Sequence, residues 1–540
     1  MSSNAKPFAD TFSPMDWTPT ISSFVKLLGL WTAYKLCKRF KHVSALSFLP
    51  GPPTVSYVWG NLFDLKKAPV GTRYNVWRKI YGPVYTLREL LMEPILVMGD
   101  PKGALHVLNK STIYWRPAID RVILALWFGP SVLSTEADVH AQRRRKLNPA
   151  FTPQSVKQVS SVLTDLTHSL VSDWDDKLGP DESLVVNVAE ALHRFALNAI
   201  SRTMFAYDLS DSTGSIPSLL KNISEGPTGP DTTLARTAAV IVSTFPQLMG
   251  LPNPMKSWAT MLRTELRKIA EAVWDSAEEI ETLEGMDARA LEVLSQANKN
   301  GDYVSKDDAV AEIVGLLFAG SETVANVMGE FLYELAHQPA VQSKVREELT
   351  AFEARNSGPP SYSDLFASSK NGLEYFNAVI MEVLRCKAVL MEITREANVD
   401  DVIPLSQPLR GMNEPVLHVR KGQIVSIPVR DGLNVDTTIW GEDADQFRPE
   451  RWLENDTVEH GIGPGGVLTF GEGTKACVGR HFAMAELKIV SSTLIRNFSF
   501  LPSEAEFDID FYHLGGNTVK PKVRGKESEG VRLPLLIRRL

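Results

Sequence analysis

The segment FGEGTKACVG, residues 470–479, decides the expected fold, and an amphipathic helical pattern follows it over residues 480–497. Glycines at 471 and 473 permit a tight loop that approaches a ligand closely. Cys477 then lies just before a helix N-terminus, where the helix dipole and free N–H groups stabilise a thiolate and lower its pKa. Gly479 would let this helix lie flat against a planar ligand. A lone cysteine is ordinarily a small buried apolar residue, but the complete ten-residue pattern favours a metal-ligating thiolate.

A second pattern, AGSET at residues 319–323, interrupts a long apolar helical pattern that begins at Ser305. Glycine inside a helix costs about 1 kcal/mol against alanine, and a buried carboxylate is expensive. A polar face turned to solvent would explain both residues. The apolar neighbours Phe318, Val324 and Ala325 argue against that explanation, so we expect a functional reason for the interruption.

Two further patterns carry charges at helical spacing. Glu382 and Arg385 stand i and i+3 on the helix predicted over residues 373–385, so their side chains can form an ion pair. His140 and Arg144 stand i and i+4 on another predicted helix. Each pattern is weak alone, because E-x-x-R occurs on many surface helices and the basic run at residues 143–145 fits a solvated face.

Together these patterns resemble the cytochrome P-450 family, and its fungal microsomal members in particular. Residues 470–479 resemble the haem-binding loop F-x-x-G-x-R-x-C-x-G, with Lys475 in place of arginine. Residues 319–323 resemble the oxygen-binding groove, with Val324 in place of the usual final Thr or Ser. The resemblance implies a mainly α fold with small β-sheets (α+β), in which haem lies between the long central helix and the Cys-loop helix.

The resemblance also implies the residues that hold and serve the cofactor, haem b (iron protoporphyrin IX). Cys477 would be the iron ligand. Thr323 would hydrogen-bond dioxygen, and Glu322 would feed protons to it through water. Further haem contacts, several of them to the propionates, would come from Phe470, Gly479, Lys475, His140, Arg144 and Arg395.

A structural triad and a substrate pocket complete the implied site. FRPERW, residues 447–452, resembles the family's meander motif, so Glu382, Arg385 and Arg451 would form a buried ionic triad behind the haem. Residues 389–394 and the turn at 514–516 would close the pocket. Its lining would include Trp115, Ile119, Val122, Leu126, Leu316, Ala319 and Gly320.

The N-terminus predicts a single membrane anchor. Residues 21–37 are mostly apolar, but Lys26 and Lys35 interrupt them, and they are fewer than the ~20 apolar residues that a spanning helix needs. Basic residues follow over 38–42, which predicts that the remaining chain is cytosolic. We expect a tail and anchor over 1–47, a proline-rich hinge over 48–54 and one catalytic domain over 55–540, at the endoplasmic reticulum membrane. A helix that lies on the membrane, or packs on the domain, is the alternative.

Composition restricts the partners and the compartment. The 57 Lys and Arg residues against 64 Asp and Glu residues leave a net charge of -7, which gives no reason to expect nucleic acid as a partner. The three cysteines, Cys37, Cys386 and Cys477, are too few for a disulfide framework in 540 residues. This usage favours a reducing compartment.

The function implied by the resemblance is a haem-thiolate monooxygenase. It would insert one oxygen atom from O2 into a lipophilic small molecule, by hydroxylation or epoxidation, in a fungal secondary pathway with a terpenoid-like scaffold. NADPH-derived electrons would arrive through an NADPH–cytochrome reductase, with cytochrome b5 as a second candidate donor, because the chain shows no convincing flavin or nicotinamide motif. The alternatives are a haem-thiolate isomerase or dehydratase of the same fold, and a non-catalytic haem sensor.

Overall fold

The computed structural model describes residues 46–540 with gaps at 55, 62–63, 66–67, 90–91, 179–182, 210–215, 226–245, 251–252, 279–288, 300–304, 368–371, 455–461, 504–507 and 515–517. It forms two units, Met1–Leu49 and Pro50–Leu540. The predicted anchor at 21–37 lies outside the described residues, apart from Lys26, Gly29 and Leu30, which are helical. The following description concerns the larger unit.

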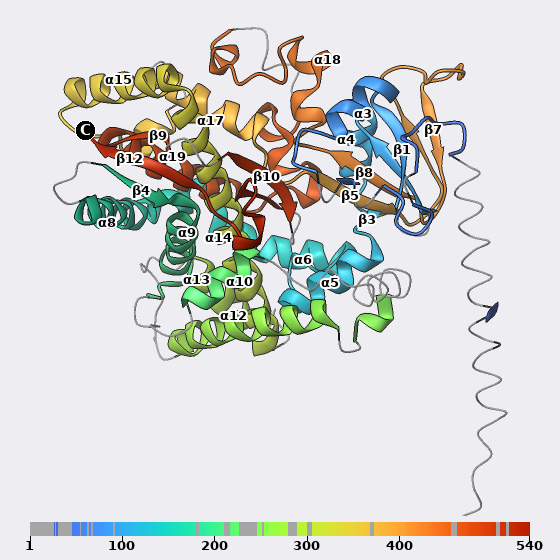
Figure 1. Cartoon of the computed structure of the whole chain (residues 1–540). Coiled ribbons are helices and arrows are strands. Elements are labelled where there is room, and N and C mark those ends of the chain that lie inside the picture. The colour runs from blue at the N-terminus through green and yellow to red at the C-terminus, as the bar shows by residue number, and fades with distance from the viewer. Residues whose placement is uncertain are drawn as a thin grey trace, which may run out of the picture. The chain divides into compact units, whose positions relative to one another are not determined.

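The largest sheet is mixed and has the strand order β1-β2-β8-β5-β3 (Figure 1). Its strands are β1 (Val84–Arg88), β2 (Pro94–Met98), β3 (Tyr114–Trp115), β5 (Glu392–Ala397) and β8 (Ile424–Pro428). β2, with the sequence PILVM, is buried at every position, as a continuous apolar run predicts for a strand covered on both faces.

Within the described residues, three smaller sheets accompany the mixed sheet. The hairpin of β10 (Ile509–Leu514) and β11 (Thr518–Val523) is antiparallel, and so is the pair of β6 (Asp401–Pro404) and β7 (Val416–Val419). The third sheet has the order β4-β12-β9, with strands Ser183–Asn187, Pro534–Arg539 and Phe498–Pro502. The predicted α+β class with small sheets is confirmed.

Helices make up the greater part of the unit (Figure 1). Their bounds are α3 Tyr74–Tyr81, α4 Pro101–Asn109, α5 Ala118–Phe128, α6 Ala137–Leu147, α7 Pro153–Gln158, α8 Ser160–Leu178, α9 Val188–Phe205, α10 Ile216–Glu225, α12 Pro254–Glu278, α13 Arg289–Lys299, α14 Lys306–His337, α15 Pro339–Asn356, α16 Tyr362–Leu365, α17 Glu374–Cys386, α18 Thr437–Trp440 and α19 Arg480–Asn497.

α14 is the long central helix predicted from Ser305 onward. The Ser305 side chain accepts a hydrogen bond from the Asp308 amide, which satisfies one of the free N–H groups at the helix start. Among the described helices, α14 alone is long and apolar enough to cross a membrane by length and composition, but 83% of its apolar window is buried inside the protein. It is therefore a core helix.

The proline segment expected to act as a hinge lies along β1. The Pro50 carbonyl accepts a hydrogen bond from the Thr86 amide at 2.9 Å, and the Asn61 side-chain amide donates to the Pro53 carbonyl at 3.0 Å. A Cβ on Gly51 would lie 2.1 Å from the Thr86 carbonyl oxygen, so only glycine permits this close approach.

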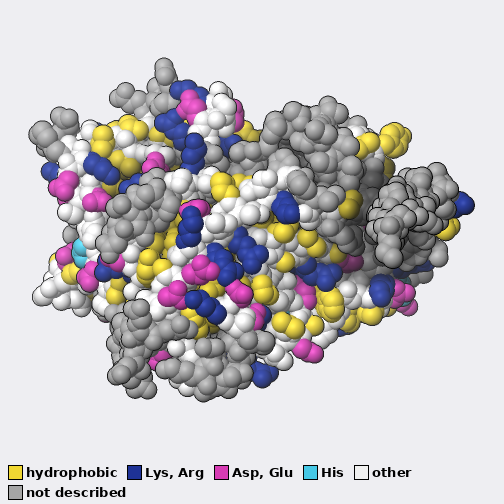
Figure 2. Space-filling view, turned by 90° about the horizontal axis from the view of Figure 1, so that it is seen from below, with side chains coloured by type: hydrophobic (Ala, Val, Ile, Leu, Met, Phe, Trp, Pro, Cys, Tyr) yellow, Lys and Arg dark blue, Asp and Glu magenta, His cyan; other side chains and the backbone are white. Residues whose placement is uncertain are grey.

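The exterior carries charges of both signs. On the face seen in Figure 2, Lys and Arg side chains lie interspersed with Asp and Glu side chains and with apolar ones. This mixture gives that face no extended field of a single sign.

Candidate active site

The loop before α19 holds Cys477 by contacts along its own backbone. The Cys477 amide donates to the Phe470 carbonyl at 2.7 Å, and Gly471 and Gly473 adopt φ of +68° and +74°, a region that glycine enters without strain. A Cβ on Gly473 would lie 2.6 Å from the Leu108 carbonyl oxygen at the end of α4. The loop therefore packs closely against the end of α4 at Gly473.

The Cys477 side chain is exposed, and it lies three residues before α19, whose interior positions are mostly buried. Its sulfur accepts a hydrogen bond from the Gly479 amide. Burial among protein atoms raises the pKa of the thiol, although the Gly479 amide, Arg144 and Arg480 oppose that rise. The expectation that the helix start lowers this pKa is therefore wrong, because the effect of burial is larger. A Cβ on Gly479 would meet nothing closer than the Phe151 ring at 3.9 Å. An accessible sulfur fits a cysteine that ligates a bound metal.

Three half-buried residues interrupt the buried part of α14. From Ala309 to Leu332 every residue is buried except Ala319, Gly320 and Thr323. These three positions lie within one helical turn, so they share one face of the helix. The Thr323 hydroxyl donates to the Ala319 carbonyl at 2.7 Å. The half-buried face therefore combines a small side chain, a glycine and a hydroxyl, and its role as the oxygen-binding groove stays a prediction.

Gly320 also sets the distance between two helices. A Cβ on Gly320 would lie 2.6 Å from Ile200 Cδ1 of α9. The missing side chain therefore allows α9 and α14 to pack closely, and Gly320 itself stays half-buried. Leu316, one turn earlier on the same face, is buried.

Glu322 is fully buried and surrounded by donors. Lys520 Nζ lies 2.6 Å from Oε1, the Thr518 hydroxyl donates to Oε1 at 3.1 Å, and His193 Nε2 lies 3.2 Å from Oε2. Burial alone would raise the pKa of the carboxyl, but Lys520 and His193 outweigh it and lower the pKa to about 2. Glu322 is therefore a carboxylate whose described contacts run to α9, β11 and its own helix.

Cationic side chains predicted to meet the propionates gather beside the cysteine loop. The Arg144 guanidinium donates to the Ala476 carbonyl, and buried His140 lies one turn earlier on α6. Burial and neighbouring cations lower the pKa of His140 to about 4. Burial, followed by the nearby Arg116, lowers the pKa of Arg395 to about 9.

Arg116 and Arg121 join this cluster, and the sequence patterns did not indicate them. Burial lowers the pKa of Arg116 to about 10, and both arginines lie close enough to Lys475 to act on its charge. Their only signal in the sequence is their place around Trp115 and the start of α5.

Acidic residues balance only part of this charge. Glu136 forms ion pairs with Lys475 and with Arg116 at 3.2 Å, and buried Asp120 acts on Arg395. The four arginines Arg116, Arg121, Arg144 and Arg395 thus outnumber these two acids, and burial followed by Arg116 and Arg121 lowers the pKa of Lys475 to about 6. The surplus of buried positive charge fits the two carboxylates of a haem, which would compensate cations that burial otherwise penalises.

Lys475 already has a partner. The resemblance assigned it to a propionate, and the structure places its buried ammonium on Glu136. A lysine is a compact point charge, so Glu136 occupies part of its capacity to bind a propionate. Glu136 was not among the predicted site residues.

The three triad residues come together around one carboxylate. Glu382, Arg385 and Arg451 are each 0% exposed. Arg451 Nε donates to Glu382 Oε1 at 3.0 Å, and Trp452 Nε1 donates to Oε2 at 2.9 Å. The triad ties α17 to the segment that contains FRPERW.

The predicted pocket residues Trp115, Ile119, Val122 and Leu126 are all half-buried on β3 and α5. Phe128 at the end of α5 packs against Phe318 of α14, with ring centroids 5.0 Å apart. α5 thus lies on α14 and leaves much of its apolar surface uncovered. Residues 515–516 of the predicted closing turn lie outside the described residues.

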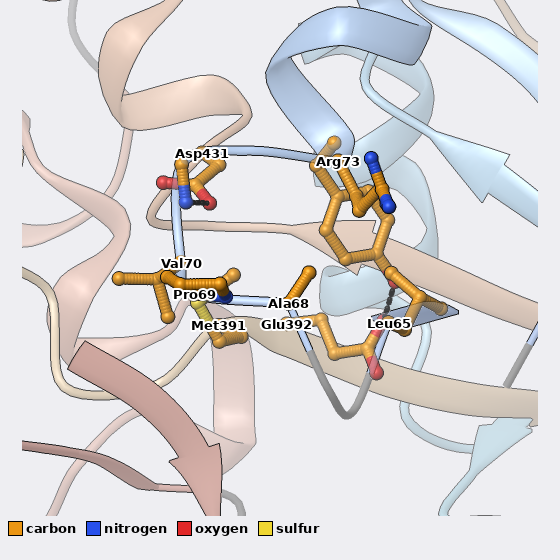
Figure 3. A pocket seen from close by; sticks show the side chains of 10 residues that line it. Leu65, Ala68, Pro69, Val70, Arg73, Met391, Glu392 and Asp431 are labelled. Atoms are coloured by element: carbon orange, nitrogen blue, oxygen red, sulfur yellow. Dashed lines mark hydrogen bonds between the residues drawn. The ribbon is translucent and has the colours of Figure 1, made fainter. Parts of the chain in front are cut away.

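A small cavity lies at another place in the fold. Figure 3 shows it between residues 65–74 and the start of β5, where Tyr74 donates to Glu392 at 2.6 Å. Its volume of ≈ 30 Å³ is about that of one water molecule. It includes none of the predicted haem residues, although Met391 and Glu392 belong to the predicted pocket wall.

Comparisons with known proteins agree with this geometry. A family model described as Cytochrome P450 matches residues 50–526. The chain is 31% identical to the cytochrome P450 monooxygenase claW of Ampulloclitocybe clavipes, over 96% of this chain and 98% of that one. It is 29% identical to the cytochrome P450 monooxygenase claU of the same fungus, over 96% and 98%. It is also 29% identical to the cytochrome P450 monooxygenase 128 of Postia placenta, over 94% and 96%.

Proposed function

The chain belongs to the cytochrome P450 family, and from that premise we propose that this monooxygenase inserts one oxygen atom into a lipophilic small molecule of fungal secondary metabolism. The accessible Cys477 thiol just before α19, beside arginines that outnumber the neighbouring acids, carries the proposal. The half-buried apolar residues of α5 support a lipophilic substrate. A terpenoid-like scaffold remains our proposal for the substrate class.

Haem b, when bound, supplies the oxygen chemistry, with electrons that come from NADPH through a reductase. In the proposed arrangement Cys477 would be the iron ligand. Arg116, Arg144 and Arg395 would hold the propionates. Phe470, Gly479, His140 and Lys475 would make further contacts with the haem.

The residues of α14 would control protons and orient the substrate. Thr323 now donates to Ala319 within its own helix, and a rotation of its hydroxyl would bring a donor to the predicted groove. Glu322, one residue earlier, would supply protons through water. Leu316, Ala319 and Gly320 would form one wall of the substrate pocket, opposite α5.

Partners and location follow from the family and from the N-terminus. The redox partner is a reductase, and we propose cytochrome b5 as a second electron donor. Residues 21–37 would anchor the protein in the endoplasmic reticulum membrane, with the catalytic domain on the cytosolic side. The positive charges at residues 38–42 support that orientation.

Two measurements test this proposal. The reduced protein with CO should give the red-shifted Soret band of a thiolate ligand, and Cys477→Ala should lose it, whereas a histidine-type band in the intact protein would contradict it. With reductase and NADPH, a lipophilic substrate should gain one oxygen atom from labelled O2. Turnover without reductase or NADPH would indicate an isomerase or dehydratase instead, and ligand binding without any turnover would indicate a sensor.

A further inference from the structure

The Glu322 carboxylate lies in a cage built from three elements. Lys520 Nζ of β11 is 2.6 Å from Oε1, and His193 Nε2 of α9 is 3.2 Å from Oε2. Thr518 of β11 and Asn326 of α14 each donate to Oε1 at 3.1 Å. All of these side chains are buried. An acid that must release and regain protons is therefore held by two basic groups.

Lys520 is fixed by a second acceptor. Its ammonium also donates to the Ile223 carbonyl of α10 at 2.9 Å, and the lysine is 0% exposed. A buried ammonium is tolerated only where acceptors compensate its lost hydration. Lys520 thus joins β11, α10 and α14, and Glu322 is its ion-pair partner.

His193 completes the cage when it carries two protons. Its Nδ1 lies 2.7 Å from the Ala189 carbonyl, so this nitrogen must be the donor because a carbonyl only accepts. In the neutral ring the Nε2 lone pair would then face the Glu322 oxygen. Neither atom has a hydrogen-bond partner within the described residues, so protonation of Nε2 would replace that repulsion with the attraction of two opposite charges 3.2 Å apart.

We infer that Lys520 and His193 are positioning residues that hold Glu322 as a carboxylate on the α9 side of α14 and thereby govern its proton delivery. The inference rests on the proposed function, in which Glu322 supplies protons. Lys520 has the larger effect, because its ammonium lies 2.6 Å from Oε1. His193 faces the other oxygen at 3.2 Å and adds a second positive charge when its Nε2 carries a proton.

Infrared spectroscopy of the resting protein tests the cage without turnover. Lys520→Met removes the charge and keeps the length of the side chain, so Glu322 should become protonated and show a carboxylic-acid carbonyl band. That band should be absent from the wild type and from the double variant Lys520→Met with Glu322→Gln. Lys488→Met is the matched control, because Lys488 is also buried but its ammonium bonds a backbone carbonyl at 2.8 Å. No band in folded Lys520→Met would overturn the inference.

A second variant decides the case if Lys520→Met does not fold. His193→Gln keeps a neutral donor near Oε2, and in an acid titration its Glu322 band should appear at higher pH than in the wild type. Lys520, His193, Thr518 and Asn326 are the groups named above that face this carboxylate. An unchanged titration would contradict the inference.

Turnover then connects the cage to catalysis. Glu322→Gln should lower the product formed per NADPH by roughly 100-fold, the lower range for a positioned general acid. Lys520→Met should lower it similarly, and the double variant should lose no more than either single one. Lys520→Arg should restore most of the yield. An unchanged yield of product per NADPH in Lys520→Met would contradict the catalytic part of the inference. A protein without a thiolate-type CO spectrum would instead refute the proposed function and leave the infrared result standing.

Discussion

Arg385 donates two parallel hydrogen bonds to Glu382, one turn earlier on α17. Its Nε lies 2.8 Å from Oε2, and its Nη2 lies 2.7 Å from Oε1. Three backbone carbonyls, those of Asn434, Ala444 and Gln446, accept the remaining donors of Arg385. The guanidinium therefore connects α17 to segments about 50 and 60 residues further along the chain.

Loss of Arg385 should destabilise the protein strongly. Arg385→Met leaves the buried Glu382 carboxylate with less positive charge, and breaking a buried pair costs about 3–5 kcal/mol. Arg524→Met is the control, because Arg524 is 57% exposed where it pairs with Asp508, and an exposed pair contributes about 0–1 kcal/mol. Denaturant unfolding measures both changes. Equal losses in the two variants would contradict a special role for the triad.

Arg116 should prove necessary for haem retention. Arg116→Met removes a cation next to Glu136 and Arg395. Because a hydrogen bond to a charged group contributes about 1.5–3 kcal/mol, haem affinity should fall by roughly tenfold or more. The haem-to-protein absorbance ratio after dilution measures this loss. Exposed Arg145 on α6 provides the matched control, and Arg145→Met should keep its haem. Full retention by Arg116→Met would remove this residue from the haem site.

Gly473→Ala should displace the cysteine loop. Alanine at φ +74° is strained, and its Cβ would lie 2.6 Å from the rigid Leu108 carbonyl. Gly411→Ala is the control for backbone strain alone, because Gly411 has φ +83° with nothing within 4 Å of the added Cβ. Backbone strain should lower the free energy of unfolding of each variant by about 1–2 kcal/mol. Only Gly473→Ala should also lose the thiolate-type spectrum of the reduced protein with CO. A normal spectrum for Gly473→Ala would show that the loop can move away from α4.

Glu486 on α19 should make stability depend on pH. The structure gives neither of its carboxylate oxygens a hydrogen-bond partner within the described residues, and burial raises the pKa of this carboxyl well above its usual value. Because the pKa of Glu486 is higher in the folded than in the unfolded protein, its contribution to the free energy of unfolding is fully present below the unfolded pKa of about 4.3. That contribution is lost as the pH rises through the folded pKa.

Glu486→Gln should therefore gain unfolding free energy relative to the wild type as pH rises from about 5 to 7, by up to about 1.4 kcal/mol per pH unit. Chemical denaturation at several pH values gives this difference. Glu353→Gln, at a 45% exposed carboxylate, should show no such slope. A flat difference for Glu486→Gln would mean that the carboxyl finds a partner when folded.

Much of the fold was predictable because its signals are local. The helix after the cysteine loop begins and ends where the sequence pattern predicted, at Arg480–Asn497, and the predicted helix over 373–385 differs by one residue from Glu374–Cys386. Periodicity and caps act over a few residues, so the sequence contains them directly. The partners of Lys475 and Glu322 had no such signal, because Glu136 and Lys520 lie 339 and 198 residues away along the chain.

The sequence by itself determined where a thiolate can form, which helix carries the interrupted apolar pattern, and which family the chain resembles, because spacing along one helix or loop places neighbouring side chains. Tertiary structure alone decided that Glu322 is a caged carboxylate, that Lys475 binds Glu136, and that Arg116 joins the cations. Charge states and ion pairs depend on burial and on distances of a few ångströms. Those distances arise only when segments far apart in the chain pack together.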